Sequence, residues 1–123
     1  MSGKILMFGF DSMAEVLAVV TAVKPLGIEP VPVARGDYNK SLGVLAGLDS
    51  AGDQPPYAGS ALAGRMIVFC DLRERLEELL PVLAGAGAGP ECLKAVLTAH
   101  NRKWNPVTLY GELQRERQAM QRK

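Results

Sequence analysis

Two apolar runs stand out along the chain, at Ile5–Phe10 and Met66–Cys70. A run of this length without polar residues indicates a strand that is buried on both faces. Each run is followed by apolar residues at helical spacing, which predicts a helix packed on the sheet. Shorter strands are predicted at 28–34 and 93–98. The chain therefore shows a weak internal βαβ repeat.

The starts of the two helices carry their own signals. Ser12 and Glu15 have the spacing of a capping box, in which a hydroxyl and a carboxylate each accept a backbone N–H. Asp71 is predicted to cap the second helix in the same manner. Pro81 lies inside that second helix and is predicted to kink or shorten it.

The two long apolar strands are predicted to be central and adjacent, with 28–34 at an edge. Pro30 and Pro32 are two residues apart, so the positions that lack an N–H point in the same direction. A central strand needs donors on both sides, whereas an edge strand tolerates their absence on one side. Two prolines at this spacing therefore favour the edge.

The middle and the end of the chain have sequence patterns that differ from the two βαβ segments. A short helix is predicted at 39–48, followed at 49–64 by a flexible loop rich in Gly, Pro, Ser and Ala. The connection between the second and third strands is long enough for a parallel crossover. Asn105-Pro106 is a favourable helix start, and it predicts a basic C-terminal helix over 106–123.

These elements predict one domain over residues 1–123 with an α/β fold. We expect a small, mostly parallel four-stranded sheet flanked by helices, because strands and helices alternate. The alternative is an α+β sandwich of the ferredoxin-like, split βαβ kind with a long insertion.

Composition and charge only exclude some classes of function and location. The formal net charge of +1 gives no strong signal for nucleic acid. Residues 1–100 carry a net −3 and residues 101–123 a net +4, typical of a solvated basic helix. The two cysteines are too few for a disulfide framework, and no apolar stretch reaches the length of a membrane span. We therefore expect a cytoplasmic protein.

The C-terminal half contains a short motif and a spaced set of residues after it. These residues are Lys94, Ala95, Val96, Leu97, Thr98, Asn101, Trp104, Leu109, Glu112 and Leu113. With them, this half resembles a bacterial family known only as a domain of unknown function. The resemblance covers about residues 66–117, and the stretch at 39–43 is also similar. It implies no reaction and no cofactor.

The candidate site residues share a position after a predicted strand. In an open α/β sheet, ligands bind at the carboxyl ends of the strands. If all strands are parallel, Asp11, Asp71 and Thr98 meet at one rim, together with Arg35–Asp37. The ferredoxin-like alternative instead separates the first two strand ends from the last two. Asn101 and Trp104 complete the candidate ligand-binding set.

No motif for catalysis, metal or cofactor binding accompanies these residues. His100 is the only histidine, and Cys70 is expected to be a buried, inert thiol. We therefore expect a non-catalytic binding or regulatory module for a small molecule or a protein partner, with self-association as one option. The alternative is an enzyme or phospho-acceptor that uses Asp11, Asp71 and Thr98.

Overall fold

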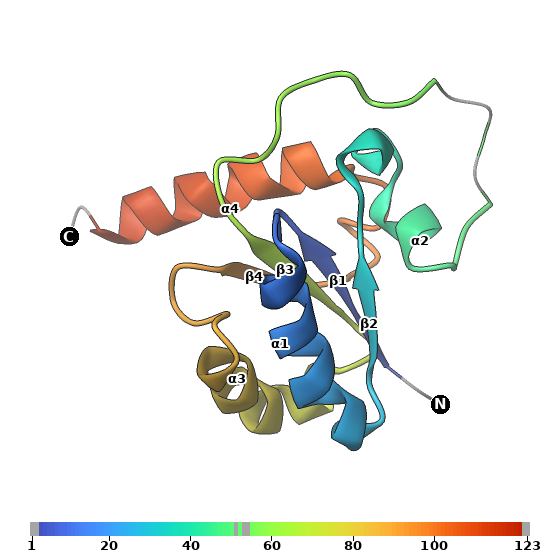
Figure 1. The fold of residues 1–123 in the computed structure, drawn as a ribbon. Coiled ribbons are helices and arrows are strands. Elements are labelled where there is room, and N and C mark those ends of the chain that lie inside the picture. Colours follow the sequence, from blue (N-terminus) through green and yellow to red (C-terminus); the bar gives the residue numbers. More distant parts are fainter. Residues whose placement is uncertain (1–2, 51, 53–54, 122–123) are drawn as a thin grey trace.

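A mixed sheet forms the centre of the molecule, as seen in a computed structural model that describes residues 3–50, 52 and 55–121. The strands have the order β2-β1-β3-β4 (Figure 1). β1 is parallel to β2 and β3 is parallel to β4, whereas β1 and β3 are antiparallel. The fold is therefore α/β with a mostly parallel sheet. The strands are β1 (Lys4–Phe8), β2 (Glu29–Pro32), β3 (Met66–Cys70) and β4 (Leu93–Val96).

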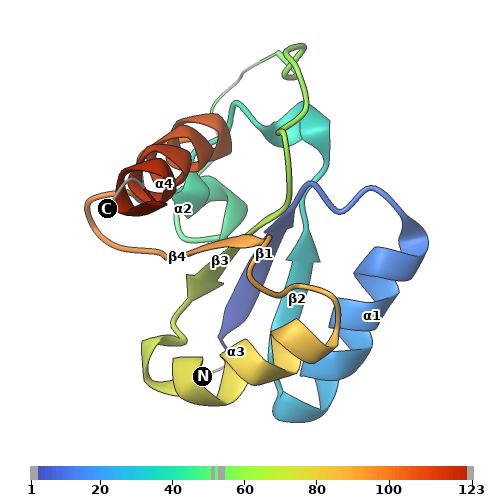
Figure 2. The same ribbon diagram turned by 90° about the vertical axis from the view of Figure 1, so that its left-hand side faces the viewer.

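Helices cover both faces of the sheet (Figures 1 and 2). α1 and α3 lie side by side on one face, and α2 and α4 lie on the other. Within the described part of the chain, no helix combines the length and the apolar character that a membrane crossing requires. The helices are α1 (Met13–Val23), α2 (Leu42–Leu45), α3 (Leu76–Gly85) and α4 (Pro106–Gln121).

The two central strands supply the core of both layers because their side chains alternate between the faces. Ile5 and Met7 of β1 pack under α1 and α3 with Val19, Leu79 and Leu83. Leu6 and Phe8 pack on the opposite face. Their neighbours there are Tyr38, Leu42, Met66, Val68, Leu93, Leu109 and Tyr110.

The predicted positions of the strands in the sheet are confirmed. β1 and β3 are central neighbours, and β2 is at an edge. Glu29 and Val33 donate their N–H groups to the carbonyls of β1 and its flank, at 3.1 and 2.9 Å. Pro30 and Pro32 alternate with these donors, so the missing N–H groups face away from β1.

The internal repeat is also confirmed, and it extends to the strand register. Lys4 pairs with Glu29 in the first βαβ unit as Met66 pairs with Leu93 in the second. Each unit places its helix on the same face of the sheet. Because the two units meet through the antiparallel β1–β3 pair, one unit is inverted relative to the other.

Two topological predictions need correction. The connection from the second strand to the third is not a parallel crossover, because β3 runs antiparallel to β1 and does not pair with β2. The ferredoxin-like alternative fails as well, since β1 and β2 are direct neighbours with no strand between them. The inversion of the two halves that it implied is nevertheless present.

The two helix starts differ. The capping box of α1 is confirmed, since Ser12 Oγ accepts the N–H of Glu15 at 3.1 Å and Glu15 Oε1 accepts the N–H of Ser12 at 3.4 Å. The predicted cap at Asp71 is wrong. Asp71 has a φ of 60°, and a 3-10 helix at Arg73–Arg75 precedes α3, which has no side-chain cap.

The predicted loop at 49–64 contains neither helix nor strand among its described residues. Tyr57 anchors part of it, because its N–H donates to Gly36 at 2.8 Å and its ring packs against Tyr38. α2 is shorter than the helix predicted at 39–48. Residues 51, 53–54 and 122–123 lie outside the described residues, and the flexibility of 49–64 stays a prediction.

Candidate functional site

The candidate residues lie at opposite ends of the sheet. Asp11 follows β1, at the end where β3 begins with Met66. Asp71 and Thr98 follow β3 and β4, at the end where β1 begins. The two ends of β1 alone are ~13 Å apart at about 3.3 Å per residue. The prediction of one common rim is therefore wrong, and its cause is the antiparallel central pair.

A cavity of about 650 Å³ lies at the carboxyl ends of β3 and β4, and we call it the β3–β4 cleft. It brings together Asp71 and Thr98 from the candidate set. The segment after α2 closes its other side, so both halves of the chain contribute. The lining residues are Lys4, Ala46, Gly47, Leu48, Cys70, Asp71, Leu97, Thr98, Ala99 and Arg102.

Asp71 is the conformational exception at this cleft. It is the only residue other than glycine with a positive φ among the described residues. A left-handed backbone strains an L-residue, although aspartate tolerates it better than most. Its exposed carboxylate forms no hydrogen bond or ion pair with any residue that the structure describes. Strain of this kind is often found at functional positions.

Thr98 and Asn101 form hydrogen bonds mainly with each other. Asn101 Oδ1 accepts the N–H of Thr98 at 2.9 Å, and Thr98 Oγ1 accepts the N–H of Asn101 at 3.1 Å. Asn101 Nδ2 donates to the carbonyl of Val96 at 3.0 Å, and the residue is only 8% exposed. These bonds close the turn after β4 and leave the Asn101 side chain little capacity for a ligand.

Two cations border the cleft, and both have partners. Arg102 donates from Nε to Asp49 at 2.9 Å and forms an ion pair through Nη2 at 2.5 Å. This guanidinium lowers the pKa of Asp49 through the hydrogen bond. Lys4 Nζ donates to the carbonyl of Ala46 at 2.8 Å, which leaves two of its three N–H groups for other acceptors.

The Cys70 thiol forms part of the apolar floor. It is 5% exposed, and burial raises its pKa to about 11, although nearby Lys4 acts in the opposite direction. A thiol with this pKa is protonated at neutral pH and is therefore a poor nucleophile. The expectation of a buried, inert thiol agrees with this environment.

Trp104 holds the turn to the rest of the fold. Its ring packs with the cluster on the α2 and α4 face and meets His100 edge-on at 5.1 Å between centroids. The carbonyl of Trp104 accepts the N–H of Leu42, and that of Arg102 accepts the N–H of Gly43. Trp104 does not line the β3–β4 cleft, so its place in the ligand-binding set stays a prediction.

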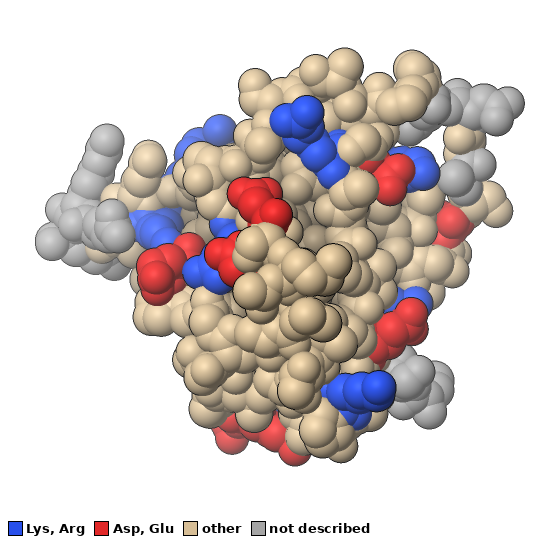
Figure 3. Space-filling model, viewed as in Figure 1, with Lys and Arg blue, Asp and Glu red and all other residues tan. Residues whose placement is uncertain are grey.

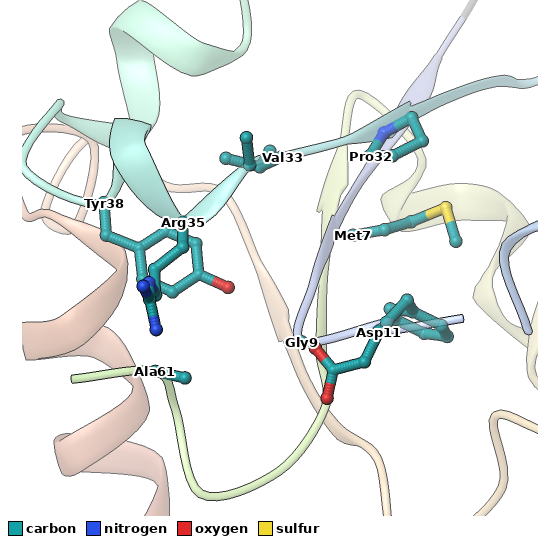
Figure 4. A pocket seen from close by; sticks show the side chains of 10 residues that line it. Met7, Gly9, Asp11, Pro32, Val33, Arg35, Tyr38 and Ala61 are labelled. Atoms are coloured by element: carbon teal, nitrogen blue, oxygen red, sulfur yellow. The ribbon is translucent and has the colours of Figure 1, made fainter. Parts of the chain in front are cut away.

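A smaller cavity of about 320 Å³ lies at the other end of the sheet, and we call it the β1–β2 pocket (Figure 4). Asp11 lines it together with Arg35 and Tyr38. Tyr38 is 3% exposed, and Figure 4 shows its hydroxyl directed into the pocket. Burial raises the pKa of this hydroxyl, with a further contribution from the Asp11 carboxylate.

Sequence reasoning missed Tyr38, Lys4 and Asp49. Lys4 precedes an apolar run and reads as a solvated flank, while Asp49 opens the predicted loop. Tyr38 is an isolated aromatic residue among Gly, Asp and Asn residues. An aromatic residue in such a polar segment is the one signal that indicates a buried anchor there.

Outside these cavities, the surface of α1 and α3 carries few charges (Figure 3). Met13 and Leu17 of α1 and Leu80 of α3 are exposed there, at 72%, 52% and 42%. Across the described ranges, no group of three or more His, Cys, Asp or Glu residues is placed to hold a metal ion.

Residues 65–120 match the model of a family described as a domain of unknown function, DUF3783. The match covers the second βαβ unit together with α4. No curated protein and no solved structure matches the chain. The resemblance of the C-terminal half to a domain of unknown function is thereby confirmed, whereas its motif and bacterial origin stay predictions.

Proposed function

We propose that this protein is a non-catalytic binding module that takes a small, mostly apolar ligand into the β3–β4 cleft. The observation that carries the proposal is the cleft itself, about 650 Å³ at the carboxyl ends of a parallel strand pair. Cavities of this size with an apolar lining and a few polar groups are typical of small-molecule sites.

The lining suggests how such a ligand would lie. Leu48, Leu97 and Cys70 offer apolar surface for the body of the ligand. Asp71 and Lys4 supply opposite charges that no described residue joins in an ion pair. We expect a charged or polar group of the ligand to contact one of them, with Asp71 preferred because its carboxylate forms no other bond to the described residues.

Binding fits these residues better than catalysis. The Cys70 thiol is protonated at neutral pH, and Thr98 is bonded within its own turn. Asp11 lies at the opposite end of the sheet from Asp71 and Thr98. An enzyme or a phospho-acceptor that needs all three together is therefore not supported by their placement.

The test is a fragment screen by NMR on the ¹⁵N-labelled full chain, with cationic, anionic and neutral compounds. We expect the hits to shift the amide signals of residues 70–71 and 97–99. Ala99 is exposed at the cleft, so Ala99→Trp fills the space without disturbing the core. Ala61→Trp is the matched control, because Ala61 lines the β1–β2 pocket instead.

The proposal predicts that Ala99→Trp abolishes the shifts and that Ala61→Trp leaves them unchanged. Asp71→Asn is expected to weaken the cationic hits by about tenfold, the loss of one charge-assisted contact of about 1.4 kcal/mol. A screen whose hits all map elsewhere, or hits that survive Ala99→Trp, would overturn the proposal.

A further inference from the structure

Three polar groups line the β1–β2 pocket: the Tyr38 hydroxyl, the Arg35 guanidinium and the Asp11 carboxylate. Figure 4 shows the Tyr38 hydroxyl directed toward the side of the pocket that carries Gly9 and Asp11, with Arg35 beside the tyrosine. The charges of Arg35 and Asp11 both act on the Tyr38 hydroxyl, which indicates that all three share one local environment.

None of these three groups forms a hydrogen bond or ion pair with a side chain that the structure describes. No hydrogen bond or ion pair to the described residues involves the Arg35 guanidinium or the Asp11 carboxylate. The neighbouring acid, Asp37, is paired with Lys40 at 2.9 Å and does not line the pocket. Gly9 lies near the Tyr38 oxygen, and no hydrogen bond between described residues uses the O–H proton, which is left for another acceptor.

We propose that the β1–β2 pocket binds a small zwitterion of the amino-acid class. The carboxylate of the ligand would accept from the Arg35 guanidinium and the Tyr38 hydroxyl, and its ammonium group would donate to Asp11. Its side chain would lie against Val33, an apolar residue of the lining.

The balance of charge in the pocket selects a zwitterion over a simple ion. An anion that pairs with Arg35 is repelled by Asp11, and a cation that pairs with Asp11 is repelled by Arg35. A ligand with both charges satisfies both residues through charge-assisted hydrogen bonds. Arg35 and Asp11 form no ion pair with each other, so both charges are available to a molecule that lies between them.

The volume of the pocket sets the size of the ligand. About 320 Å³ equals the space of roughly ten water molecules at about 30 Å³ each. An amino acid with a side chain of moderate size fits this space. The site lies at the opposite end of the sheet from the β3–β4 cleft, so this inference is independent of the function proposed above.

The experiment titrates the full ¹⁵N-labelled chain with L-alanine, L-leucine and L-phenylalanine. Two leucine analogues are titrated in parallel: 4-methylpentanoate, which lacks the ammonium group, and isopentylamine, which lacks the carboxylate. We expect at least one amino acid to shift the amide signals of Gly9, Asp11 and Arg35. We expect each leucine analogue to bind at least tenfold more weakly than L-leucine.

Variants separate the two charges. Asp11→Asn is expected to weaken L-leucine at least tenfold without weakening 4-methylpentanoate, which has no ammonium group to lose. Arg35→Gln should likewise spare isopentylamine. Asp37→Asn is the matched control, because it removes a nearby carboxylate outside the pocket, and it should change none of these affinities.

The inference is overturned if none of the three amino acids shifts signals in the pocket. It is also overturned if Asp11→Asn weakens L-leucine and 4-methylpentanoate by the same factor, since the carboxylate would then act only on the fold. Thermal unfolding of each variant identifies such a loss of structure directly, and Ala61→Trp provides a second variant that blocks the pocket from its exposed side.

Discussion

The two βαβ units of this protein share one backbone plan, a parallel strand pair joined by a helix, but they differ in the side chains that follow the outer strand. Their strand registers correspond pair by pair, and their helices lie together on one face of the sheet. After the outer strand, however, the first unit leaves Arg35 and Tyr38 facing a pocket. The second unit instead bonds Thr98 to Asn101 and Arg102 to Asp49. Equivalent positions in a repeat can therefore carry unequal chemistry.

The sharpest difference lies at the first residue after each leading strand. Gly9 follows β1 five residues after Lys4, and Asp71 follows β3 five residues after Met66. Both have a positive φ, of 79° and 60°. The backbone plan therefore demands a left-handed residue at this point in both units. Glycine meets that demand without strain, whereas aspartate meets it at some cost.

Gly9→Ala is the substitution expected to break the first unit most severely. A Cβ at this position would lie 2.4 Å from the carbonyl oxygen of Gly64, and φ would remain positive. We expect the free energy of unfolding to fall by about 2–4 kcal/mol from strain and displacement of the backbone. Urea denaturation measures this loss.

A matched control is available in the same unit. Gly27 also has a positive φ, of 74°, but a Cβ there would meet nothing within 4 Å. Gly27→Ala therefore carries the conformational strain without the clash, and it should cost less than Gly9→Ala. Equal losses for the two substitutions would show that the approach of Gly64 is unimportant.

The strand ends before these two residues also differ, because Cys70 occupies the place that Phe8 has in β1. Burial raises the pKa of Cys70 from 9.0 to about 11. Between these pH values the folded state binds more protons than the unfolded state, so stability falls as the pH rises. The loss due to this thiol should approach about 2 kcal/mol.

Denaturation of the wild type and of Cys70→Ala between pH 8 and pH 11 isolates this contribution, since other titrating groups are common to both. The wild type should lose more stability across the range than the variant. Parallel pH profiles would contradict the assigned burial. In that case the ends of β1 and β3 would not differ in the pH dependence of stability, although Phe8 has no proton to lose and Cys70 has one.

The sequence was most informative where a pattern is local. The apolar runs located β1 and β3, the spacing of Pro30 and Pro32 located the edge strand, and the Ser12 and Glu15 pair located the start of α1. Each of these depends on neighbouring residues only. They are the features that hydrogen bonding and burial impose directly on a short segment.

The direction of the second unit in the sheet could not be predicted from such local patterns. Parallel and antiparallel placement of β3 beside β1 bury the same apolar side chains, and the long connection at 33–65 permits both. The cap at Asp71 failed for a related reason. The same residue type serves as a helix cap or as a left-handed turn residue, and only the geometry after β3 decides between them.

The helix starts provide a smaller test of the comparison. Ser12 caps α1, whereas Glu74, at the corresponding place in the second unit, makes no capping bond. We expect Ser12→Ala to lower the free energy of unfolding by about 1 kcal/mol. Glu74→Ala should change it by less than about 0.5 kcal/mol, as expected for an exposed residue without such a bond. Losses of equal size would mean that both helices are capped alike.

Asp71→Gly is the smallest and most informative change, because its expected sign is opposite. Relief of the left-handed backbone is worth about 1–2 kcal/mol, and the greater freedom of glycine in the unfolded chain offsets roughly 0.5–1 kcal/mol of it. The variant should therefore be more stable than the wild type by up to about 1.5 kcal/mol. If the Asp71 carboxylate contacts the ligand of the β3–β4 cleft, the same variant should bind cationic fragments about tenfold more weakly.

Asp71→Asn separates the two effects, since asparagine also tolerates the left-handed region and should lose binding without gaining stability. A variant that is stabilised and still binds normally would show that the strain at Asp71 serves only the turn. The two units would then differ in stability alone, and the carboxylate would have no part in the proposed function.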